Sequence, residues 1–513
     1  MADTTPAPGL ANPAASGSLR ASAAAAATRL FETDFTRRAA FAALASCFLV
    51  LRAPFLPYGH GTDPDAWRVA MTAYHLLETG DYFPSRLPGN PLHELVTVLL
   101  IPGGWIATGI ATALVSLAGV YLFARIVRHL ELPQPGLLVI GFAFTPLLFI
   151  NSIATMDYMW TLTCILAAYG ATLRRSSLLA GLCIGLAIGF RLQSFILWPA
   201  FAYLLWRQDQ RRDIAPFTLA MAGVAALAYA PVLAVYGGDF YNFYDAHVGY
   251  LDVIRLLGKE ALGVLGGLGV LTGAALSLRR LRHLPADALR DPQVAVWLGI
   301  IVIYLGTFSR LPHEIAYLIP IFPFGIFLMA RYFTRVALIG SIAAILFAGL
   351  ADITTPGDSL NLTSLRSASV GRGLVLSNAE TMEIQRQFVE DIMGNDVPDH
   401  SVVMTGFIFP QLAVRERDRL EARIVQRDYE AISMLSDRGE AVDTERDIHY
   451  VWLLTYESFN ALRSQGYAFY QVPDAAGSTG HLYDYRPGLL GASFLNLDRT
   501  APSAGKGTAN TDR

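Results

Sequence analysis

Residues 57–95 read PYGHGTDPDAWRVAMTAYHLLETGDYFPSRLPGNPLHEL and separate two apolar stretches, at about 39–56 and 96–123. An apolar stretch of roughly 20 residues is long enough to cross a bilayer as a helix. The segment between the two stretches is polar and carries two carboxylates near its start, Asp63 and Asp65. A polar loop between two membrane-spanning helices holds its ionisable side chains at the membrane surface. Chemistry is therefore expected first in this loop.

The first half of this loop is predicted to be helical. Over residues 66–79, apolar side chains recur at three- and four-residue steps, at Trp67, Ala70, Met71, Tyr74 and Leu77. This spacing predicts an amphipathic helix that lies along the membrane surface and ends at Gly80. The second half is rich in proline and glycine, which predicts an irregular return to the next membrane segment. A simpler interpretation of the two carboxylates is that they only cap helices.

Composition divides the whole chain into an apolar part and a polar part. Of the 513 residues, 53% are hydrophobic and 16% are charged, against about 45–50% and 25% in soluble proteins. The first 350 positions hold 43 of the charged residues and the last 163 positions hold 38. This imbalance excludes an all-soluble enzyme. The net charge of -3 argues against a protein that binds nucleic acid through a basic surface.

We predict an α-helical polytopic membrane protein with about 11 transmembrane helices. The apolar segments lie at about 39–56, 96–123, 136–151, 158–173, 177–190, 194–206, 214–235, 261–278, 293–308, 314–331 and 336–351. Short cytoplasmic loops collect Lys and Arg. Alternate loops here are basic, at Arg37 and Arg38, Arg125 and Arg128, Arg174 and Arg175, Arg207, Arg211 and Arg212, Arg279, Arg280 and Arg282, and Arg331 and Arg335. The loop 57–95 and the chain beyond about 352 are therefore placed on the outer side.

The chain is expected to contain four parts. Residues 1–28 are small and polar and predict a disordered leader, and 29–351 form the transmembrane domain. Residues 352–498 predict a small α/β extracytoplasmic domain, and 499–513 a disordered tail. Within the α/β domain the patterns predict a helix at about 379–394 and strands at 401–406, 449–456 and 467–472, in an order that favours a partly parallel sheet. Arginines alternate with acids over 415–427, which is typical of a solvated face.

The loop resembles the catalytic outer loop of the GT-C superfamily of integral-membrane glycosyltransferases, which includes aminoarabinose transferases, protein O-mannosyltransferases and polyprenol-dependent mannosyltransferases. In the aminoarabinose-transferase type, Asp-Glu precedes a helix, Gly-Asp-aromatic, Arg-x-x-Gly and a Glu. The matching positions here are Asp65, Gly80-Asp81-Tyr82, Arg86, Gly89 and Glu94. Ala66 stands where that family has its Glu, so a mechanism with two adjacent carboxylates would need Asp63 as the substitute.

Three later motifs extend the resemblance through the membrane part. The segment 151–157, which ends in Asp157, is similar to the second outer loop of these enzymes. Glycines at 181, 185 and 189 precede Arg191, as in a small-residue helix that ends in an outer arginine. Close helix packing explains the same glycine spacing without any function. The segment 310–320 is similar to the short late loop that carries basic and aromatic residues.

The resemblance implies transfer of a sugar from a polyprenyl-phosphate donor with inversion at the anomeric carbon. It implies Asp65 as the general base, with Asp63 and Asp157 orienting the acceptor or holding a divalent cation. Metal dependence is left open. The donor phosphate is expected to bind Arg191 first, then Arg310 and His313. Five further residues are expected to organise the substrate or the loops: Arg86, Glu94, Asp81, Glu314 and His247.

Simpler roles exist for two of the arginines. Arg191 lies between two apolar runs and would also suit a side chain that snorkels to lipid headgroups. Arg86 would also suit a structural role in which it braces the loop against Glu94.

The expected partners are the lipid-linked sugar donor, membrane lipids and a lipid, glycan or protein acceptor. Arginine dominates the basic residues, with lysine only at 259 and 506. This favours a bacterial source and hence the inner (cytoplasmic) membrane, with the C-terminal domain in the periplasm. Two other interpretations stay open. A lipid-linked glycan polymerase or ligase would be expected to carry a large outer loop between late spans, and a secondary transporter would place ionisable residues near the bilayer midplane.

The arginine alternation makes a topological prediction. Reporters fused after about residue 354 should be active only on the non-cytoplasmic side, because an inside N-terminus and an odd number of spans leave the C-terminal part outside. A paired test with a phosphatase that needs export and a fluorescent protein that needs the cytoplasm measures this. A cytoplasmic C-terminus would remove the shared outer face on which the predicted site depends.

Overall fold

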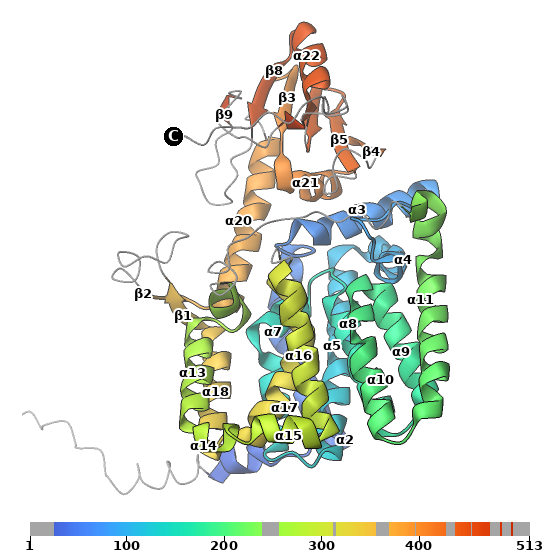
Figure 1. Cartoon of the computed structure of the whole chain (residues 1–513). Helices are drawn as coiled ribbons and strands as arrows, with labels where there is room; N and C mark the ends of the chain where they lie inside the picture. The colour runs from blue at the N-terminus through green and yellow to red at the C-terminus, as the bar shows by residue number, and fades with distance from the viewer. Residues whose placement is uncertain are drawn as a thin grey trace, which may run out of the picture.

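A computed structural model describes residues 25–238, 256–310, 314–354, 369–394, 397–426, 437–452, 454–471, 483–484 and 494–495. Figure 1 shows a bundle of helices with a smaller strand-containing domain over one end. Most of the predicted leader and all of the predicted tail lie outside the described residues.

Each of the predicted apolar segments is helical, as expected from its length and composition. The helices of the bundle are α2 (Arg38–Arg52), α4 (Pro91–Leu100), α5 (Gly104–His129), α6 (Pro135–Phe144), α7 (Pro146–Asn151), α8 (Tyr158–Leu173), α9 (Ser177–Phe190), α10 (Trp198–Arg207), α11 (Ile214–Tyr236), α13 (Val264–Leu276), α16 (Pro292–Arg310), α17 (Phe322–Tyr332) and α18 (Arg335–Ala348). The prediction of a polytopic helical membrane domain is confirmed.

The number of complete spans is a separate matter. Within the described residues, 5 helical stretches are long and apolar enough to cross a membrane, or 6 if a pair bent by 71° counts as one span. Four shorter apolar helices, among them α6 and α9, fall below that length. Pro146 follows the break between α6 and α7 in the segment predicted at 136–151, and proline lacks the N–H that an unbroken helix would use there. The count of 11 stays a prediction.

Glycine spacing allows α9 to approach α11 closely. A Cβ atom at Gly181 would lie 2.3 Å from the carbonyl oxygen of Phe217, and one at Gly185 would lie 2.6 Å from Cβ of Val224. Neither distance leaves room for a side chain. The packing interpretation of this motif is confirmed, and Arg191 follows α9 directly as its C-cap.

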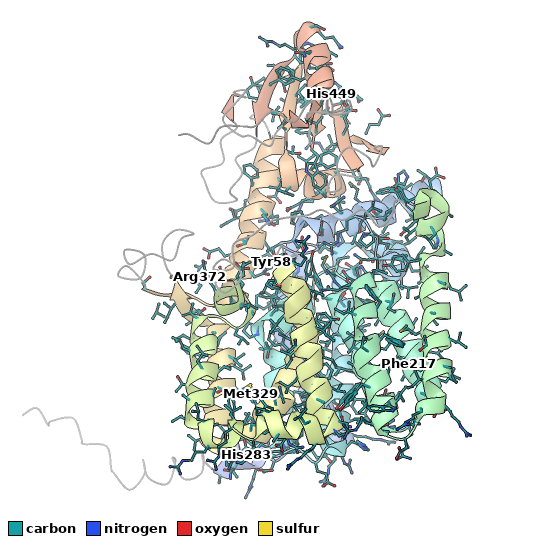
Figure 2. The ribbon with its side chains drawn as sticks, viewed as in Figure 1. Tyr58, Phe217, His283, Met329, Arg372 and His449 are labelled. Carbon is teal, nitrogen blue, oxygen red and sulfur yellow. The ribbon has the colours of Figure 1, made fainter. Side chains whose placement is uncertain are left out.

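The two ends of the bundle differ in content. In Figure 1, α3 (Pro64–Thr79) and the strand-containing domain lie at one end, and α14 (Leu278–Leu281) and α15 (Leu284–Arg290) lie at the other. Figure 2 shows Tyr58, near the start of the polar loop, and His283, which follows the basic run of α14, at these opposite ends. The loop 57–95 and the C-terminal domain therefore share one end of the bundle, as the arginine alternation predicts.

The C-terminal domain contains a six-stranded sheet in the order β4-β5-β6-β3-β8-β9. The central strands β6, β3 and β8 are parallel, which confirms the partly parallel sheet. The strands are β3 (Ser401–Met404), β4 (Glu421–Gln426), β5 (Asp437–Asp443), β6 (Ile448–Val451), β8 (Ala468–Gln471) and β9 (Tyr483–Asp484). Helix α20 (Leu374–Gly394) precedes β3, α21 (Phe409–Arg415) follows it, and α22 (Tyr456–Ser464) precedes β8.

The structure corrects one expectation about this domain. Strand β4 occupies part of the segment 415–427. Arg415, the first residue of this segment, packs against the membrane domain, so the segment is not simply a solvated face.

Helix α3 forms as predicted, with Gly80 in the left-handed conformation as its C-cap. Its apolar side, however, packs against the C-terminal domain, where Trp67 and Met71 share one hydrophobic cluster with Phe409 and neighbouring residues. The buried part of this face is therefore covered by protein, and the predicted position of α3 along the membrane surface stays a prediction.

Candidate active site

The start of α3 positions the two carboxylates of the polar loop. Asp63 is the N-cap of the helix, and its Oδ1 accepts a hydrogen bond of 2.9 Å from the backbone N–H of Asp65. Pro64 occupies the first helical position, where its missing N–H costs nothing. The capping interpretation is thus confirmed for Asp63. The side chain of Asp65 points elsewhere and keeps 24% of its surface exposed.

Arg86 joins this pair to a third carboxylate. It forms an ion pair with Asp65 through Nη1 and Oδ2, and its Nη2 lies 3.9 Å from Oδ1 of Asp157. Arg68, one turn after Asp65 on α3, lies 3.5 Å from Oδ1 of Asp65 through its Nη1. The side chain of Asp157 is fully buried, at 0% exposed. Two carboxylates that are distant in the sequence, Asp65 and Asp157, therefore lie against the one guanidinium of Arg86.

Arg191 completes the cluster from the end of α9. Its Nη1 lies 2.6 Å from Oδ2 of Asp157. The guanidinium carbon lies 4.4 Å from the ring centre of Tyr158 and 4.5 Å from that of Tyr317. Only 11% of the Arg191 side chain is exposed. An arginine that is ion-paired and held between two aromatic rings does not snorkel, so that alternative is wrong.

Glu94 does not pair with Arg86, as the bracing role would require, but binds other groups of the loop. Its carboxylate accepts hydrogen bonds from the hydroxyl of Tyr82 at 2.5 Å and from the backbone N–H of Ser85 at 2.8 Å. The hydroxyl of Ser85 donates to it as well, at 2.6 Å. Glu94 therefore fixes the loop that carries Arg86 and leaves Arg86 to the aspartates. The proposed Arg86–Glu94 contact is wrong, and the loop-organising role of Glu94 is supported.

Two acidic groups at the site have altered proton affinity. Burial raises the pKa of Asp63, and the negative charge of Asp157 adds to this effect, while Arg86 and Arg191 oppose it. Burial also raises the pKa of Glu314 to about 8, and the negative charge of Asp63 contributes. Glu314 accepts a hydrogen bond of 3.5 Å from the backbone N–H of Ala316, at the start of the 3-10 helix Ile315–Ile321. Glu314 therefore holds its proton to higher pH than an ordinary glutamate does.

No contact with the cluster is described for the four remaining predicted residues. Asp81 is exposed just beyond the C-cap of α3. Arg310 is the exposed last residue of α16. His247 and His313 lie outside the described residues. Roles for these four residues stay predictions.

The cluster includes residues that the sequence analysis did not assign. Arg68 is spaced three residues from Asp65 on a predicted helix, a spacing that already places the two side chains on one face. Tyr158 follows Asp157 directly. His93 on α4 is 2% exposed, and its Nδ1 has no hydrogen-bond partner. Nothing in the sequence marks His93, because its burial arises from packing of distant segments.

The residues do not form a metal centre of the usual kind. In the described part of the chain, no three His, Cys, Asp or Glu side chains gather closely enough to hold a metal ion. The guanidinium of Arg86 contacts both Asp65 and Asp157, where a shared cation would need to bind. The arrangement of Asp63, Asp65 and Asp157 therefore does not fit a divalent cation.

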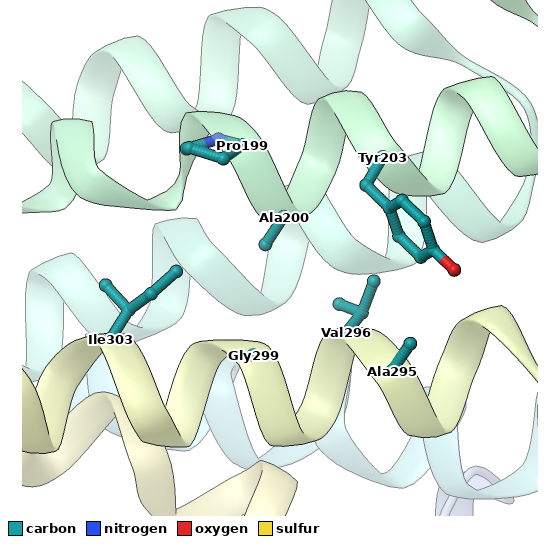
Figure 3. A pocket seen from close by; sticks show the side chains of 7 residues that line it. All are labelled: Pro199, Ala200, Tyr203, Ala295, Val296, Gly299 and Ile303. Atoms are coloured by element: carbon teal, nitrogen blue, oxygen red, sulfur yellow. The ribbon is translucent and has the colours of Figure 1, made fainter. Parts of the chain in front are cut away.

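An apolar hollow lies in the membrane part of the bundle. Figure 3 shows side chains from α10 and α16 around it, and its volume is about 300 Å³. The lining residues are Pro199, Ala200, Tyr203, Ala295, Val296, Gly299 and Ile303. None of them is ionisable at neutral pH, so this hollow is suited to hydrocarbon and is chemically separate from the ionisable cluster.

Comparisons with known proteins give a fold-level likeness. No protein-family model and no curated protein matches the chain. The solved structure of ArnT from Cupriavidus metallidurans bound to undecaprenyl phosphate is 15% identical, with a TM-score of 0.43, over 74% of this chain and 69% of that chain. Its apo state is 15% identical, with a TM-score of 0.42, over 73% of this chain and 68% of that chain.

The raised pKa of Glu314 makes a prediction about stability. An unfolded Glu ionises near 4.5, whereas folded Glu314 ionises near 8. Folded wild-type protein binds the extra proton between these values, so its stability falls as pH rises through this window and levels off above it. Glu314→Gln removes this loss. The melting temperature of the variant minus that of wild type should therefore grow from pH 5 to pH 8 and then stay constant.

The measurement is a thermal melt of detergent-solubilised protein at each pH. Glu131→Gln, at an exposed position, is the matched control and should show no such trend. A difference between wild type and Glu314→Gln that is independent of pH would contradict the shifted ionisation of Glu314.

Proposed function

We propose that this chain is an inverting GT-C-type membrane glycosyltransferase. It moves a sugar from a polyprenyl-phosphate donor to a lipid, glycan or protein acceptor on the outer face of a bacterial cytoplasmic membrane. One observation carries the proposal. Asp65 and Asp157 share a single cluster with Arg86 and Arg191, beside the helix that Asp63 caps, at the end of the bundle that the arginine alternation assigns to the outside.

The arginines suit the phosphate of such a donor. Guanidinium groups keep their charge and present two parallel N–H donors to phosphate oxygens. Arg86 and Arg191 are paired with carboxylates, which like phosphate are oxyanions. A bound phosphate competes with these carboxylates for the same N–H groups. Tyr158 and Tyr317 hold Arg191 in place while its partner changes.

Asp65 suits the general base. It is partly exposed, whereas Asp157 is fully buried and Asp63 is engaged in capping α3. Asp65 takes the proton from the acceptor hydroxyl or amine as the acceptor atom attacks the anomeric carbon. The bond between that carbon and the phosphate oxygen breaks, and polyprenyl phosphate leaves with the electron pair. A single displacement of this kind inverts the anomeric configuration.

The hydrocarbon tail of the donor needs an apolar surface within the membrane. The hollow between α10 and α16 supplies such a surface in the bundle. We choose undecaprenyl phosphate as the carrier in the experiments below, since it is the lipid bound in the ArnT structure.

The geometry favours transfer over transport. A secondary transporter would place its ionisable side chains near the bilayer midplane. The cluster here lies instead where α3, the polar loop and the start of the helix Ile315–Ile321 meet, at one end of the bundle. A polymerase or ligase of lipid-linked glycans would use related chemistry. It differs in its donor, which would carry a glycan chain rather than one sugar.

The first test of this function is the loss of the base. Asp65→Asn is nearly isosteric, so it should preserve insertion and donor binding, while turnover falls by at least about 10²-fold. Transfer is measured from a panel of synthetic undecaprenyl-phosphate monosaccharides, radiolabelled in the sugar, to a cell-envelope extract. Asp63→Asn should be milder if Asp63 only caps and orients, and similar if the two residues act as one unit.

Asp418→Asn, which changes a carboxylate that is 94% exposed, is the control and should match wild type. Near-normal turnover of Asp65→Asn would move the base to Asp63 or Asp157. Near-normal turnover in Asn variants of all three residues would refute the catalytic-carboxylate proposal.

The second test concerns the phosphate. Arg191→Lys keeps the charge but loses the planar fork and its stacking between two tyrosines, so use of the donor should weaken with the protein still inserted. Arg191→Ala should be worse. Binding of radiolabelled undecaprenyl phosphate to purified protein measures this without any acceptor. Equal binding by wild type and both variants would remove Arg191 from the phosphate site.

A further inference from the structure

The C-terminal domain is joined to the polar loop through a shared hydrophobic core. Trp67, Ala70 and Met71 of α3 belong to the same buried cluster as Phe409 and Leu412 of α21. Such a cluster holds two parts of a chain as one unit, because separating them would expose apolar surface on both sides. The C-terminal domain therefore holds α3, the helix at whose start Asp63 and Asp65 lie.

Polar contacts fix this arrangement next to the acidic pair. Asn378 on α20 donates a hydrogen bond of 2.9 Å to the hydroxyl of Thr62, and Gln385 donates one of 3.3 Å to its carbonyl oxygen. Thr62 directly precedes Asp63. Arg415 at the end of α21 donates a hydrogen bond of 3.1 Å to the carbonyl oxygen of Tyr58. The backbone before the acidic pair is thus bound at two points by the same domain.

One contact reaches the proposed base itself. The guanidinium carbon of Arg68 lies 5.0 Å from the ring of Trp452, which follows β6, and Nη1 of Arg68 lies 3.5 Å from Asp65. Arg68 is 5% exposed and Trp452 is 4% exposed. A cation over an aromatic face is attracted to it, and more strongly where water is excluded. Trp452 therefore restricts Arg68 to the position from which it contacts Asp65.

This contact matters most when donor is bound. Among the residues that the structure describes, Asp65 pairs with two cations, Arg86 and Arg68. A donor phosphate competes for Arg86, which also contacts Asp157, so the hold of Arg86 on Asp65 weakens at that moment. Arg68 is the partner that remains to orient the carboxylate toward the acceptor.

We propose that Trp452 is a positioning residue: through its contact with Arg68, the C-terminal domain holds Asp65 in its working orientation and so forms part of the catalytic centre. The proposal rests on the proposed function for its kinetic consequences. Its structural content, that Trp452 orders the start of α3, stands independently of the reaction.

The experiment compares three variants of the full chain in lipid nanodiscs. Trp452→Leu keeps apolar volume but removes the aromatic face, and Trp452→Phe keeps an aromatic face. Phe469→Ala is the matched control, because Phe469 packs on Phe459 at a ring distance of 4.5 Å within the same domain. The readouts are kcat and donor KM in the transfer assay above, and hydrogen exchange of the backbone amides over residues 62–72.

In Trp452→Leu, kcat should fall about tenfold while donor KM stays within about twofold, since orientation of the base is lost and donor binding is not. Amides over 62–72 should exchange faster than in wild type. Trp452→Phe should restore most of both properties, and Phe469→Ala should match wild type in both.

Two outcomes would overturn the proposal. One is unchanged exchange over 62–72 in Trp452→Leu, and the other is an equal loss of kcat in Trp452→Leu and Phe469→Ala. If wild type transfers no sugar from any donor of the panel, the proposed function fails, and the exchange comparison still decides whether Trp452 orders the start of α3.

Discussion

Pairing of charges at the edge of an apolar bundle is the constraint on which this structure depends. An unpaired ion buried away from water loses several kcal/mol of solvation, so each charge at such a place needs a partner of opposite sign. Asp65, Arg86, Asp157 and Arg191 form a chain of alternating signs that satisfies this need. Such a chain brings together residues from α3, the loop after it, the start of α8 and the end of α9. The arrangement of these four elements brings the aspartates and arginines close enough to form their ion pairs.

The surroundings of the cluster show how the pairing is maintained. Glu94 fixes the loop of Arg86 through Tyr82 and Ser85. The glycines of α9 let that helix pack closely against α11, and Arg191 follows directly after α9. Above the cluster, the C-terminal domain covers α3. The proposed exchange of these ion pairs for contacts with a phosphate would need such a rigid frame, because the frame must keep its shape while the partners change.

Several features followed from local sequence alone. The apolar segments form helices because their length and composition leave no other way to satisfy the backbone in lipid. Asp63 caps α3 and Gly80 ends it, as the residue types at these positions predict. The same reasoning did not identify what covers Arg415 and the buried part of the apolar face of α3, which pack against other parts of the chain. A periodic pattern shows that a face will be buried. It does not show by which partner.

The sequence by itself determined the helical membrane domain, the placement of the basic loops at one end, the polar loop with Asp63 and Asp65, and the partly parallel sheet of the C-terminal domain. These depend on residue composition, periodicity and capping, which act over a few residues. Only the tertiary structure decided that Arg86 pairs with Asp65 and Asp157 rather than with Glu94, that Arg191 lies between two tyrosines, and that Trp452 contacts Arg68. Those contacts join residues up to several hundred positions apart, and their partners are selected by packing and by charge pairing in three dimensions, which no local pattern records.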